Sequence, residues 1–361
     1  MKIFILTSSL TCGGAERVAS LQANGLAKLG YEVFLLTDLK KTVTYVVEPE
    51  VTLLDIGVRG NPLLLRWRQF RLMYKLIQEY RPDFVISHLA YCAMAALEAR
   101  MLLGGKRPLI IVADHNSYER PACAPMPRRQ YIQKFHINRL YDYVTVLTHA
   151  DKRYIDFRLK HVAVMPNPVV DFPSVGVVKK QKVVLAVGRI DAWHCKGFDL
   201  LIAAWNEIAP KHPDWCLRIV GAGSDASKHY LSQLCKVPNF ELIDYTPAIA
   251  GYYAESSIFV LSSRYEGFGL VLTEAMMHHC ACIACDYKGR QGEIIMDGEN
   301  GLLCPVEDVE SLQQYILRLI ENEEFRHNLQ LNADKHLERF SVGNYALRWQ
   351  RLLNSLYQSI D

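Results

Sequence analysis

The chain has 361 residues, of which 50% are hydrophobic and 22% are charged, and its formal net charge is +3. These globular values exclude a disordered chain, a collagen-like repeat and a small scaffold held together by disulfides. The charge is uneven, because residues 1–170 carry 23 Lys and Arg against 14 Asp and Glu, whereas residues 171–361 carry 18 against 24. The basic first half indicates an anionic partner.

The apolar segments show neither a secretory signal nor a membrane-spanning helix. The run Ile3–Leu6 is too short for a signal peptide, and no stretch reaches 18 apolar residues. The ten cysteines follow no framework spacing, which favours reduced thiols. We therefore expect a cytoplasmic protein, either free or peripheral on the inner face of the cytoplasmic membrane.

Short apolar runs alternate with helical patterns along most of the chain. The expected strands are Ile3–Leu6, Val33–Leu36, Val51–Leu54, Phe84–Ile86, Leu109–Val112, Val144–Leu147, Val162–Met165, Val183–Val187, Leu217–Val220, Phe240–Ile243, Ile258–Leu261 and Ile283–Cys285. The expected helices include Ala15–Leu29, Leu63–Tyr80, Cys92–Leu103, Phe198–Ile208, Tyr230–Val237, Val309–Ile320 and Val342–Ser359. Apolar strands that alternate with helices predict parallel sheets covered on both faces.

The pattern pauses after Pro166-Asn167-Pro168 and restarts at Lys182, and the polar segment between them is typical of a linker. We therefore predict an α/β protein with two doubly wound, Rossmann-like domains, residues 1–170 and 171–341. No strand follows the helical pattern that begins at Val342. Residues 342–361 are therefore expected to pack on a domain that is already complete.

Glycine-rich turns and cations follow several of the expected strands, where ligands of open α/β sheets bind. Gly13 and Gly14 precede the first helix, which suits either a bound anion or a plain tight turn. Arg189 and Lys196 follow the first strand of the second domain. Two cations at a strand end favour a diphosphate over two solvated loop residues.

The segment Gly221-Ala222-Gly223-Ser224-Asp225-Ala226 matches the dinucleotide fingerprint, and Glu241 follows at the distance of its acidic residue. The match begins after the second strand of its domain rather than the first. A tight turn whose glycines allow a close approach remains the alternative.

The most informative stretch runs from Ser262 to Met276. Glu266 lies in a loop ahead of an expected helix, and Glu274 lies inside that apolar helix, where a carboxylate needs partners. Eight helical residues span roughly 12 Å, so the two carboxylates suit the two ends of one elongated ligand. The free N–H groups near Leu270 and Val271 suit a phosphate between them. A nucleotide-diphospho-sugar fits this pattern.

Together these motifs resemble the family-4 retaining glycosyltransferases of the GT-B fold, over nearly the whole chain. The motifs that carry the resemblance are Gly13-Gly14-Ala15-Glu16-Arg17, Asp114-His115-Asn116, Pro166-Asn167-Pro168, Gly188-Arg189, Lys196-Gly197, Gly221-x-Gly223, the Glu266/Glu274 pair and Gly298-x-Asn300-Gly301. The resemblance implies that the first domain binds the acceptor and that the second binds the nucleotide-sugar donor, with a cleft between them. It also implies a C-terminal helix that crosses back to the first domain and a sugar transfer that retains the anomeric configuration.

The resemblance also implies roles for individual residues. Arg189 and Lys196 would bind the donor diphosphate, Glu266 the sugar hydroxyls and Glu274 the ribose hydroxyls. His115 would lie by the sugar, and Gly14 by the phosphate. The donor site as a whole comprises Gly14, Arg189, Lys196, Gly221, Gly223, Glu266, Gly267, Phe268, Gly269, Leu270, Val271 and Glu274, with Glu266, His115, Arg189 and Lys196 as the catalytic set.

The expected substrates are a nucleotide sugar, with UDP preferred from family tendency, and a glycan acceptor on a lipid carrier, lipopolysaccharide or surface polysaccharide. No cofactor is expected. A metal site at His278, His279, Cys280, Cys282 and Cys285 is disfavoured because no second ligand pair has a useful spacing. Peripheral contact with an anionic membrane is expected through a basic, aromatic helix that carries Arg66, Trp67, Arg68, Phe70 and Arg71.

Nucleic acid is disfavoured as a partner, since no helix-turn-helix, zinc or RNP-type motif is present. Three other functions stay open at this stage. They are a GT-B nucleotide-sugar epimerase, an NAD-dependent oxidoreductase that uses Gly221 and Gly223, and a non-catalytic nucleotide-sugar-binding scaffold.

Overall fold

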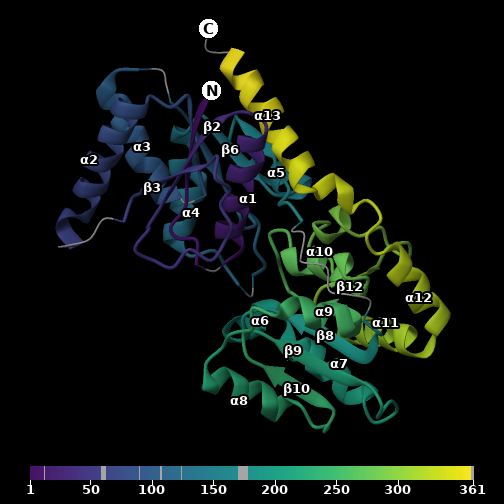
Figure 1. Cartoon of the computed structure of the whole chain (residues 1–361). Helices are drawn as coiled ribbons and strands as arrows, with labels where there is room; N and C mark the ends of the chain where they lie inside the picture. Colours follow the sequence, from purple (N-terminus) through teal and green to yellow (C-terminus); the bar gives the residue numbers. More distant parts are fainter. Residues whose placement is uncertain are drawn as a thin grey trace. The chain divides into compact units, whose positions relative to one another are not determined.

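The computed structural model describes residues 1–11, 13–57, 62–88, 90–105, 108–122, 124–169 and 178–358. The chain divides into two compact units (Figure 1). Unit 1 comprises Met1–Glu119, Met126–Pro168 and Arg339–Asp361, and unit 2 comprises Arg120–Pro125 and Val169–Glu338. Residues 120–125, which the sequence analysis places in the first domain, thus group with unit 2. Most of the expected linker lies outside the described residues.

Unit 1 is built on a seven-stranded parallel sheet with the order β3-β2-β1-β4-β5-β6-β7. Its strands are β1 Lys2–Leu6, β2 Glu32–Thr37, β3 Thr52–Asp55, β4 Phe84–Ser87, β5 Leu109–Ala113, β6 Tyr143–Val146 and β7 Val162–Val164. Its helices are α1 Gly14–Lys28, α2 Pro62–Tyr80, α3 Ala90–Leu103, α4 Arg128–Phe135, the 3₁₀ helix η1 Ile137–Leu140, α5 His149–Ile155 and α13 Val342–Gln358.

The C-terminal helix α13 packs against α1, as Figure 1 shows. A Cβ on Gly25 of α1 would lie 2.9 Å from the Cβ of Ala346, so the helices meet where α1 has no side chain. The Tyr31 hydroxyl also donates to Asn354 Oδ1 at 3.2 Å. The expectation that the last helix returns to the first domain is therefore confirmed.

Unit 2 has a six-stranded parallel sheet with the order β10-β9-β8-β11-β12-β13. Its strands are β8 Gln181–Val187, β9 Cys216–Val220, β10 Phe240–Ile243, β11 Ser256–Leu261, β12 Ala281–Cys285 and β13 Leu302–Cys304. Its helices are α6 Trp193–Lys196, α7 Phe198–Ile208, α8 Asp225–Leu234, α9 Ile249–Glu255, α10 Leu270–Met277, α11 Val309–Glu321 and α12 Glu323–Asn332, with 3₁₀ turns η2 Ile190–Ala192 and η3 Gln291–Glu293. A last 3₁₀ turn, η4 Leu337–Phe340, spans the boundary between the units.

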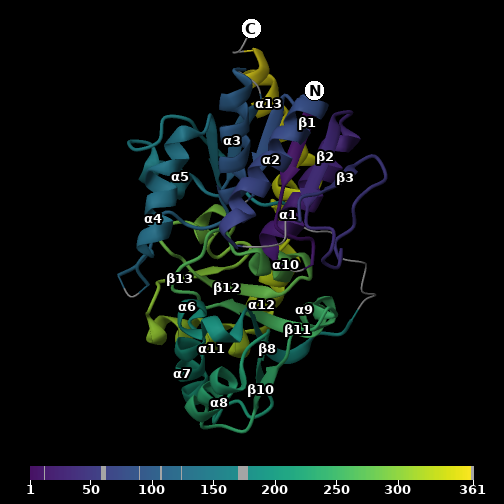
Figure 2. The same ribbon diagram turned by 90° about the vertical axis from the view of Figure 1, so that its left-hand side faces the viewer.

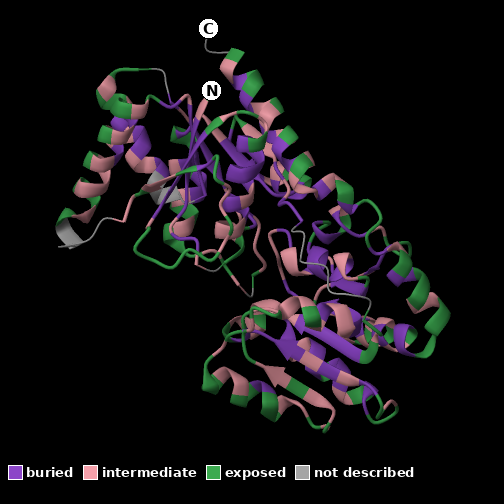
Figure 3. Ribbon diagram, viewed as in Figure 1, coloured by how far each residue is buried: buried purple, intermediate pink, exposed green. Residues whose placement is uncertain are grey.

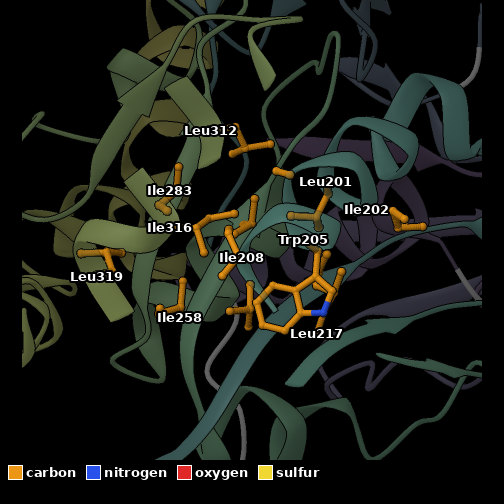
Figure 4. Packing of buried hydrophobic residues seen from close by; sticks show 14 of the residues in the cluster. Leu201, Ile202, Trp205, Ile208, Leu217, Ile258, Ile283, Leu312, Ile316 and Leu319 are labelled. Carbon is orange, nitrogen blue, oxygen red and sulfur yellow. The ribbon is translucent and has the colours of Figure 1, made fainter. Parts of the chain in front are cut away.

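Alternating strand residues supply the core of unit 2. Ile258 and Ile283 pack with Trp205 of α7 and Ile316 of α11 in one buried cluster (Figure 4). Side chains alternate between the two faces of a strand, so Phe259 points the other way and contacts Tyr253 of α9, with ring centroids 5.9 Å apart. The inner strands β8, β9, β11 and β12 are mostly buried, whereas the edge strand β10 and the outward sides of the helices are partly or fully exposed, as Figure 3 shows.

Every predicted strand is present, and β13 is an additional one. The helix expected at Tyr230–Val237 instead begins at Asp225, because Ser224 caps it by accepting a hydrogen bond from the Ser227 N–H. In each sheet the strand order reverses once, between β1 and β4 in unit 1 and between β8 and β11 in unit 2. Figure 2 labels β8 and β11. Ligands of doubly wound sheets bind at the carboxyl ends of strands beside such a point.

Candidate functional site

Two segments meet beside the point where the strand order of the unit 2 sheet reverses, between β8 and β11. One follows β8 and includes Gly188 to Gly197, and the other follows β11 and includes Ser262 to Gly269. Gly197 has a φ of 63°, and a Cβ there would lie 2.0 Å from the carbonyl oxygen of Ser262. Only glycine permits both this backbone conformation and this approach, so the sequence itself brings the loops together.

Lys196 and Glu266 form an ion pair across these loops. The Lys196 Nζ lies 2.5 Å from Glu266 Oε1, and the two side chains are 19% and 16% exposed. The Ser263 hydroxyl donates to the same carboxylate oxygen at 2.9 Å. Burial alone would lower the pKa of Lys196, but the Glu266 carboxylate outweighs it and the pKa is raised. Lys196 therefore stays protonated and can hold an anionic ligand.

Arg189 lies in the same loop and is exposed. It has no carboxylate partner within the described residues, and its charge acts on Lys196. Two cations, Arg189 and Lys196, and one carboxylate, Glu266, leave a net positive charge at this strand end. Such a centre suits a diphosphate group.

Arg264 holds the two loops together, and the sequence analysis did not single it out. Its guanidinium is buried and contacts both carboxylate oxygens of Asp199 at 2.8 Å and Glu307 Oε1 at 3.0 Å. These hydrogen bonds, that to Asp199 first, raise the pKa of Arg264. Its backbone N–H also donates to the carbonyl of Cys195 at 2.9 Å, one residue before Lys196. Arg264 thus positions Lys196 and Glu266 without needing to contact a ligand.

Helix α10 begins at Leu270, four residues after Glu266, with Gly269 as its N-cap residue at a φ of 89°. Phe268 anchors the preceding loop because its side chain is buried, and Gly267 separates it from Glu266. The N–H groups of Leu270 and Val271, in the first turn, have no acceptor inside the helix. They add partial positive charge beside the Lys196 and Glu266 pair, which again favours a phosphate.

Glu274 lies further along α10 and is buried. The Tyr253 hydroxyl donates to Glu274 Oε2 at 2.9 Å, and the Tyr253 ring stacks on His278. The expectation that a carboxylate in this apolar helix needs a partner is therefore confirmed. Whether it also contacts ribose hydroxyls stays a prediction.

Gly221 and Gly223 serve the packing of unit 2. A Cβ on Gly221 would lie 1.8 Å from the Gly188 carbonyl oxygen, and one on Gly223 would lie 2.5 Å from the Cβ of Ile190. The acidic residue of the apparent dinucleotide fingerprint, Glu241, is paired with Arg218 at 2.6 Å. Each part of that fingerprint thus has a structural partner, which supports the tight-turn alternative over an NAD site.

Gly14 and His115 belong to unit 1. Gly14 is the first residue of α1 and is exposed, and Gly13 before it has a φ of 118°. L side chains rarely adopt this φ, so glycine is favoured in this turn.

His115 follows β5 and hydrogen bonds to a second histidine that the sequence analysis missed. His115 Nε2 lies 2.7 Å from Nδ1 of His88, whose Nε2 lies 2.7 Å from Gln22 Oε1. Burial lowers the pKa of His115 to about 4, against the opposing effects of Asp114 and Asn167, and it also lowers that of His88. Both rings are therefore neutral near pH 7. The adjacent strands β4 and β5 explain why residues 27 positions apart meet.

Only some of the residues predicted to contact a membrane are exposed on the basic helix α2. Trp67 is 52% exposed and stacks with Arg71, whose guanidinium lies 4.7 Å from the ring centroid. Arg66 instead pairs with Glu98 at 2.6 Å. Phe70 is partly buried and packs against the core of unit 1, so less of its ring is accessible, and the membrane contact of α2 stays a prediction. None of the helices in the described ranges is long and apolar enough to cross a membrane.

The histidines and cysteines near 278–285 do not gather around a common point. Cys280 and Cys282 bond to backbone carbonyls of unit 2. No group of three or more His, Cys, Asp or Glu side chains that could hold a metal is found among the residues that the structure describes. The expectation of a reaction without a cofactor stays a prediction.

Two family models match successive halves of the chain. Residues 12–171 match the model described as Glycosyltransferase Family 4, and residues 170–336 match Glycosyl transferases group 1. An uncharacterized glycosyltransferase of Haemophilus influenzae is 25% identical over 97% of this chain and 99% of its own length. The amylovoran biosynthesis glycosyltransferase AmsD of Erwinia amylovora is 27% identical over 98% of this chain and 99% of its own.

A third relative comes from Campylobacter jejuni. It is an α-1,4-N-acetyl-D-galactosaminyltransferase named for an undecaprenol-diphosphate-linked glycan, and it is 25% identical over 98% of each chain.

Solved structures share the whole fold. The sucrose-phosphate synthase of Thermosynechococcus elongatus superposes with a TM-score of 0.80, at 18% identity over 99% of both chains. HepE of Anabaena in complex with UDP-glucose gives a TM-score of 0.75, at 18% identity over 98% of this chain and 100% of the other. The predicted GT-B fold is thereby confirmed.

Proposed function

Since this chain belongs to the family 4-type glycosyltransferases, we propose that it transfers a sugar from a nucleotide-diphosphate donor, preferably a UDP-sugar, to a glycan acceptor and retains the anomeric configuration. The observation that carries the donor proposal is the Lys196–Glu266 pair at the N-terminus of α10, beside the exposed Arg189. It offers positive charge for a diphosphate next to a carboxylate for sugar hydroxyls.

The leaving group explains why cations are needed. As the bond between the anomeric carbon and the diphosphate breaks, its electron pair moves to the phosphate oxygen. Arg189, Lys196 and the N–H groups at the start of α10 would stabilise that charge. The sugar then develops oxocarbenium character, and Glu266 would hold its hydroxyls.

Retention of the anomeric configuration is consistent with an acceptor that attacks the anomeric carbon on the same face from which the diphosphate departs. The acceptor oxygen forms the new bond to the anomeric carbon, and the acceptor proton passes to a diphosphate oxygen. This route needs no nucleophilic side chain. His115, which is neutral and held by His88, is proposed as a further catalytic group.

The donor and acceptor classes follow the relatives. HepE is named in complex with UDP and with UDP-glucose, and TarM of S. aureus in complex with UDP. Relatives in Campylobacter and Erwinia are named for a glycan on undecaprenol diphosphate and for amylovoran biosynthesis. We therefore propose a bacterial lipid-linked glycan, lipopolysaccharide or surface polysaccharide as the acceptor.

A lipid-linked acceptor would require contact with a membrane surface. On α2, Leu64 and Trp67 are exposed, and Arg71 lies over the Trp67 ring. Exposed aromatic and basic side chains on one helix face suit an anionic lipid surface. We propose this face, without Phe70, as a peripheral contact of a protein that works in the cytoplasm.

The first experiment is a thermal-shift screen of the purified protein with UDP, GDP, ADP, their sugar conjugates and NADH. A ligand that binds only the folded state raises the Tm. We expect UDP and a subset of UDP-sugars to stabilise the protein. Stabilisation by NADH alone would overturn the glycosyltransferase proposal for this site. NMR of the anomeric proton in the product then tests retention.

A further inference from the structure

Unit 1 contains a cavity of about 150 Å³ at the carboxyl ends of β1, β2 and β3, and no role has yet been given to it. Helices α2 and α3 close its sides through Leu72, Met73 and Ala95. The polar residues at its wall are Thr7, Ser8, Asp38, Lys41 and Gln69. All of these residues belong to one compact unit.

The polar groups favour a neutral ligand rich in hydroxyls. Asp38 and Lys41 both line the cavity, so their opposite charges favour neither a phosphate nor a cation. Gln69 has no hydrogen-bond partner within the described part of the chain, although its amide can both donate and accept. A hydroxyl is a partner that a carboxylate, an amide and an ammonium can all bind.

The remaining wall is apolar, which suits the C–H face of a sugar ring. Leu72 and Met73 come from consecutive positions of α2, and Ala95 leaves room because its side chain is small. The volume is well below the roughly 300–1,000 Å³ of pockets for drug-sized ligands, so the cavity suits a single ring.

The cavity and the His88–His115 pair both lie at the carboxyl ends of neighbouring strands of the same sheet. The end of β1 lies between β2 and β4, since the Thr7 N–H donates to the Leu36 carbonyl and the His88 N–H to the Leu6 carbonyl, both at 3.0 Å. His88 in turn contacts His115 at 2.7 Å. The same sheet edge thus carries the cavity and His115.

Helix α2 separates this cavity from its exposed face. At 100° per residue, Gln69, Leu72 and Met73 lie roughly opposite Leu64, Trp67 and Arg71. A lipid contact on one side of the helix and a sugar contact on the other suit an acceptor that has both parts.

We propose that this cavity binds one hexopyranose ring of the acceptor, with Asp38 and Gln69 binding its hydroxyls and Leu72 and Met73 its apolar face. The assignment as an acceptor site rests on the proposed function. Binding of a sugar ring in the cavity does not.

Direct binding is tested by saturation-transfer NMR with three probes, the methyl α-glycosides of glucose, galactose and N-acetylgalactosamine. The variants are Ala95→Leu, which fills the cavity, and Gln69→Leu, which removes the amide at similar size. The matched control is Gln78→Leu on the exposed side of the same helix. We expect a signal for at least one glycoside, reduced at least fivefold in both cavity variants and retained in the control.

Absence of signal for all three glycosides, or an equal signal in Gln69→Leu and the control, overturns the proposal. If Ala95→Leu does not fold, Gln69→Leu decides, because Gln69 is only half-buried. In a transfer assay, Gln69→Leu should raise the acceptor KM at least ten times more than the donor KM. Failure of UDP to stabilise the protein, with glycoside binding intact, would refute the donor proposal and leave the cavity assignment standing.

Discussion

The ammonium of Lys196 lies 2.5 Å from a carboxylate oxygen of Glu266, a residue 70 positions further along the chain. The pair is largely buried, and Arg264 fixes the loops from which both side chains come. Both groups are thus in place before a ligand arrives, so little ordering of side chains has to accompany binding.

Substituting Lys196 by alanine should weaken the binding of UDP. A hydrogen bond to a charged group contributes about 1.5–3 kcal/mol, so we expect the Kd for UDP to rise at least roughly tenfold by isothermal titration calorimetry. Lys182→Ala is the matched control, since Lys182 pairs with Asp214 in an exposed ion pair of the same unit. An unchanged Kd in Lys196→Ala would contradict the diphosphate role.

Gly197→Ala should destabilise unit 2. The new Cβ would have to lie 2.0 Å from the Ser262 carbonyl oxygen at a positive φ, and we expect a loss of about 2 kcal/mol or more. Gly251→Ala is the control, because a Cβ there, inside α9, meets nothing within 4 Å. By differential scanning calorimetry the control should be neutral or more stable. Equal Tm values for both variants would show that the loops can move apart.

The two sheets and the donor loops could be predicted because strand patterns and glycine-rich turns are local signals. The helix predicted at Phe198–Ile208 has those bounds in the structure. Arg264 was missed because its partner Asp199 is 65 residues away, and the sequence does not show which carboxylate a buried arginine meets. His88 was missed for the same reason, since only the pairing of β4 with β5 brings it to His115.

The cap of α8 shows the converse case, a local signal that was misread. Serine is a preferred N-cap residue, so Ser224 is a helix-start signal that can be read from the sequence alone. Ser224 also lies within the Gly221–Ala226 fingerprint match, and the helix predicted at Tyr230–Val237 begins later than α8 does in the structure. In the structure both glycines lie close to the neighbouring loop, which favours the tight turn.

Acidification should destabilise unit 1 through its two neutral histidines. Burial lowers the pKa of His115 to about 4 and lowers that of His88, whereas histidine in an unfolded chain titrates near 6.5. The unfolded state therefore binds protons first, and stability is lost as the pH falls from about 6.5 towards 4, by up to about 1.4 kcal/mol per pH unit for each group.

The drop in Tm between pH 7 and pH 5 should thus be smaller in His115→Gln than in the wild type. His136→Gln, at an exposed position of the same unit, should keep the wild-type drop. The same drop in all three proteins would show that His115 takes up its proton in the folded state.

Trp67→Glu should reduce the binding of the protein to anionic vesicles. Trp67 is 52% exposed and holds Arg71 against its ring, so the change removes an apolar contact and adds a repelling charge. In sedimentation with vesicles of phosphatidylethanolamine and phosphatidylglycerol, we expect the bound fraction to fall several-fold. Tyr230→Glu, an exposed aromatic position of unit 2, is the control. Equal binding of both variants would exclude this face of α2 as the contact.

Glu274→Gln should separate recognition of the ribose from recognition of the diphosphate. If the Glu274 carboxylate accepts hydrogen bonds from ribose hydroxyls, the neutral amide should raise the Kd of UDP several-fold while leaving the Kd of pyrophosphate, which has no ribose, unchanged. Tyr253→Phe is the companion variant, because it removes the hydroxyl that donates to Glu274 at 2.9 Å but keeps the carboxylate. We expect a smaller effect on UDP from this change. A parallel loss of UDP and pyrophosphate binding in Glu274→Gln would instead place the effect on the whole of α10, whose first turn faces the phosphate in the proposed mechanism.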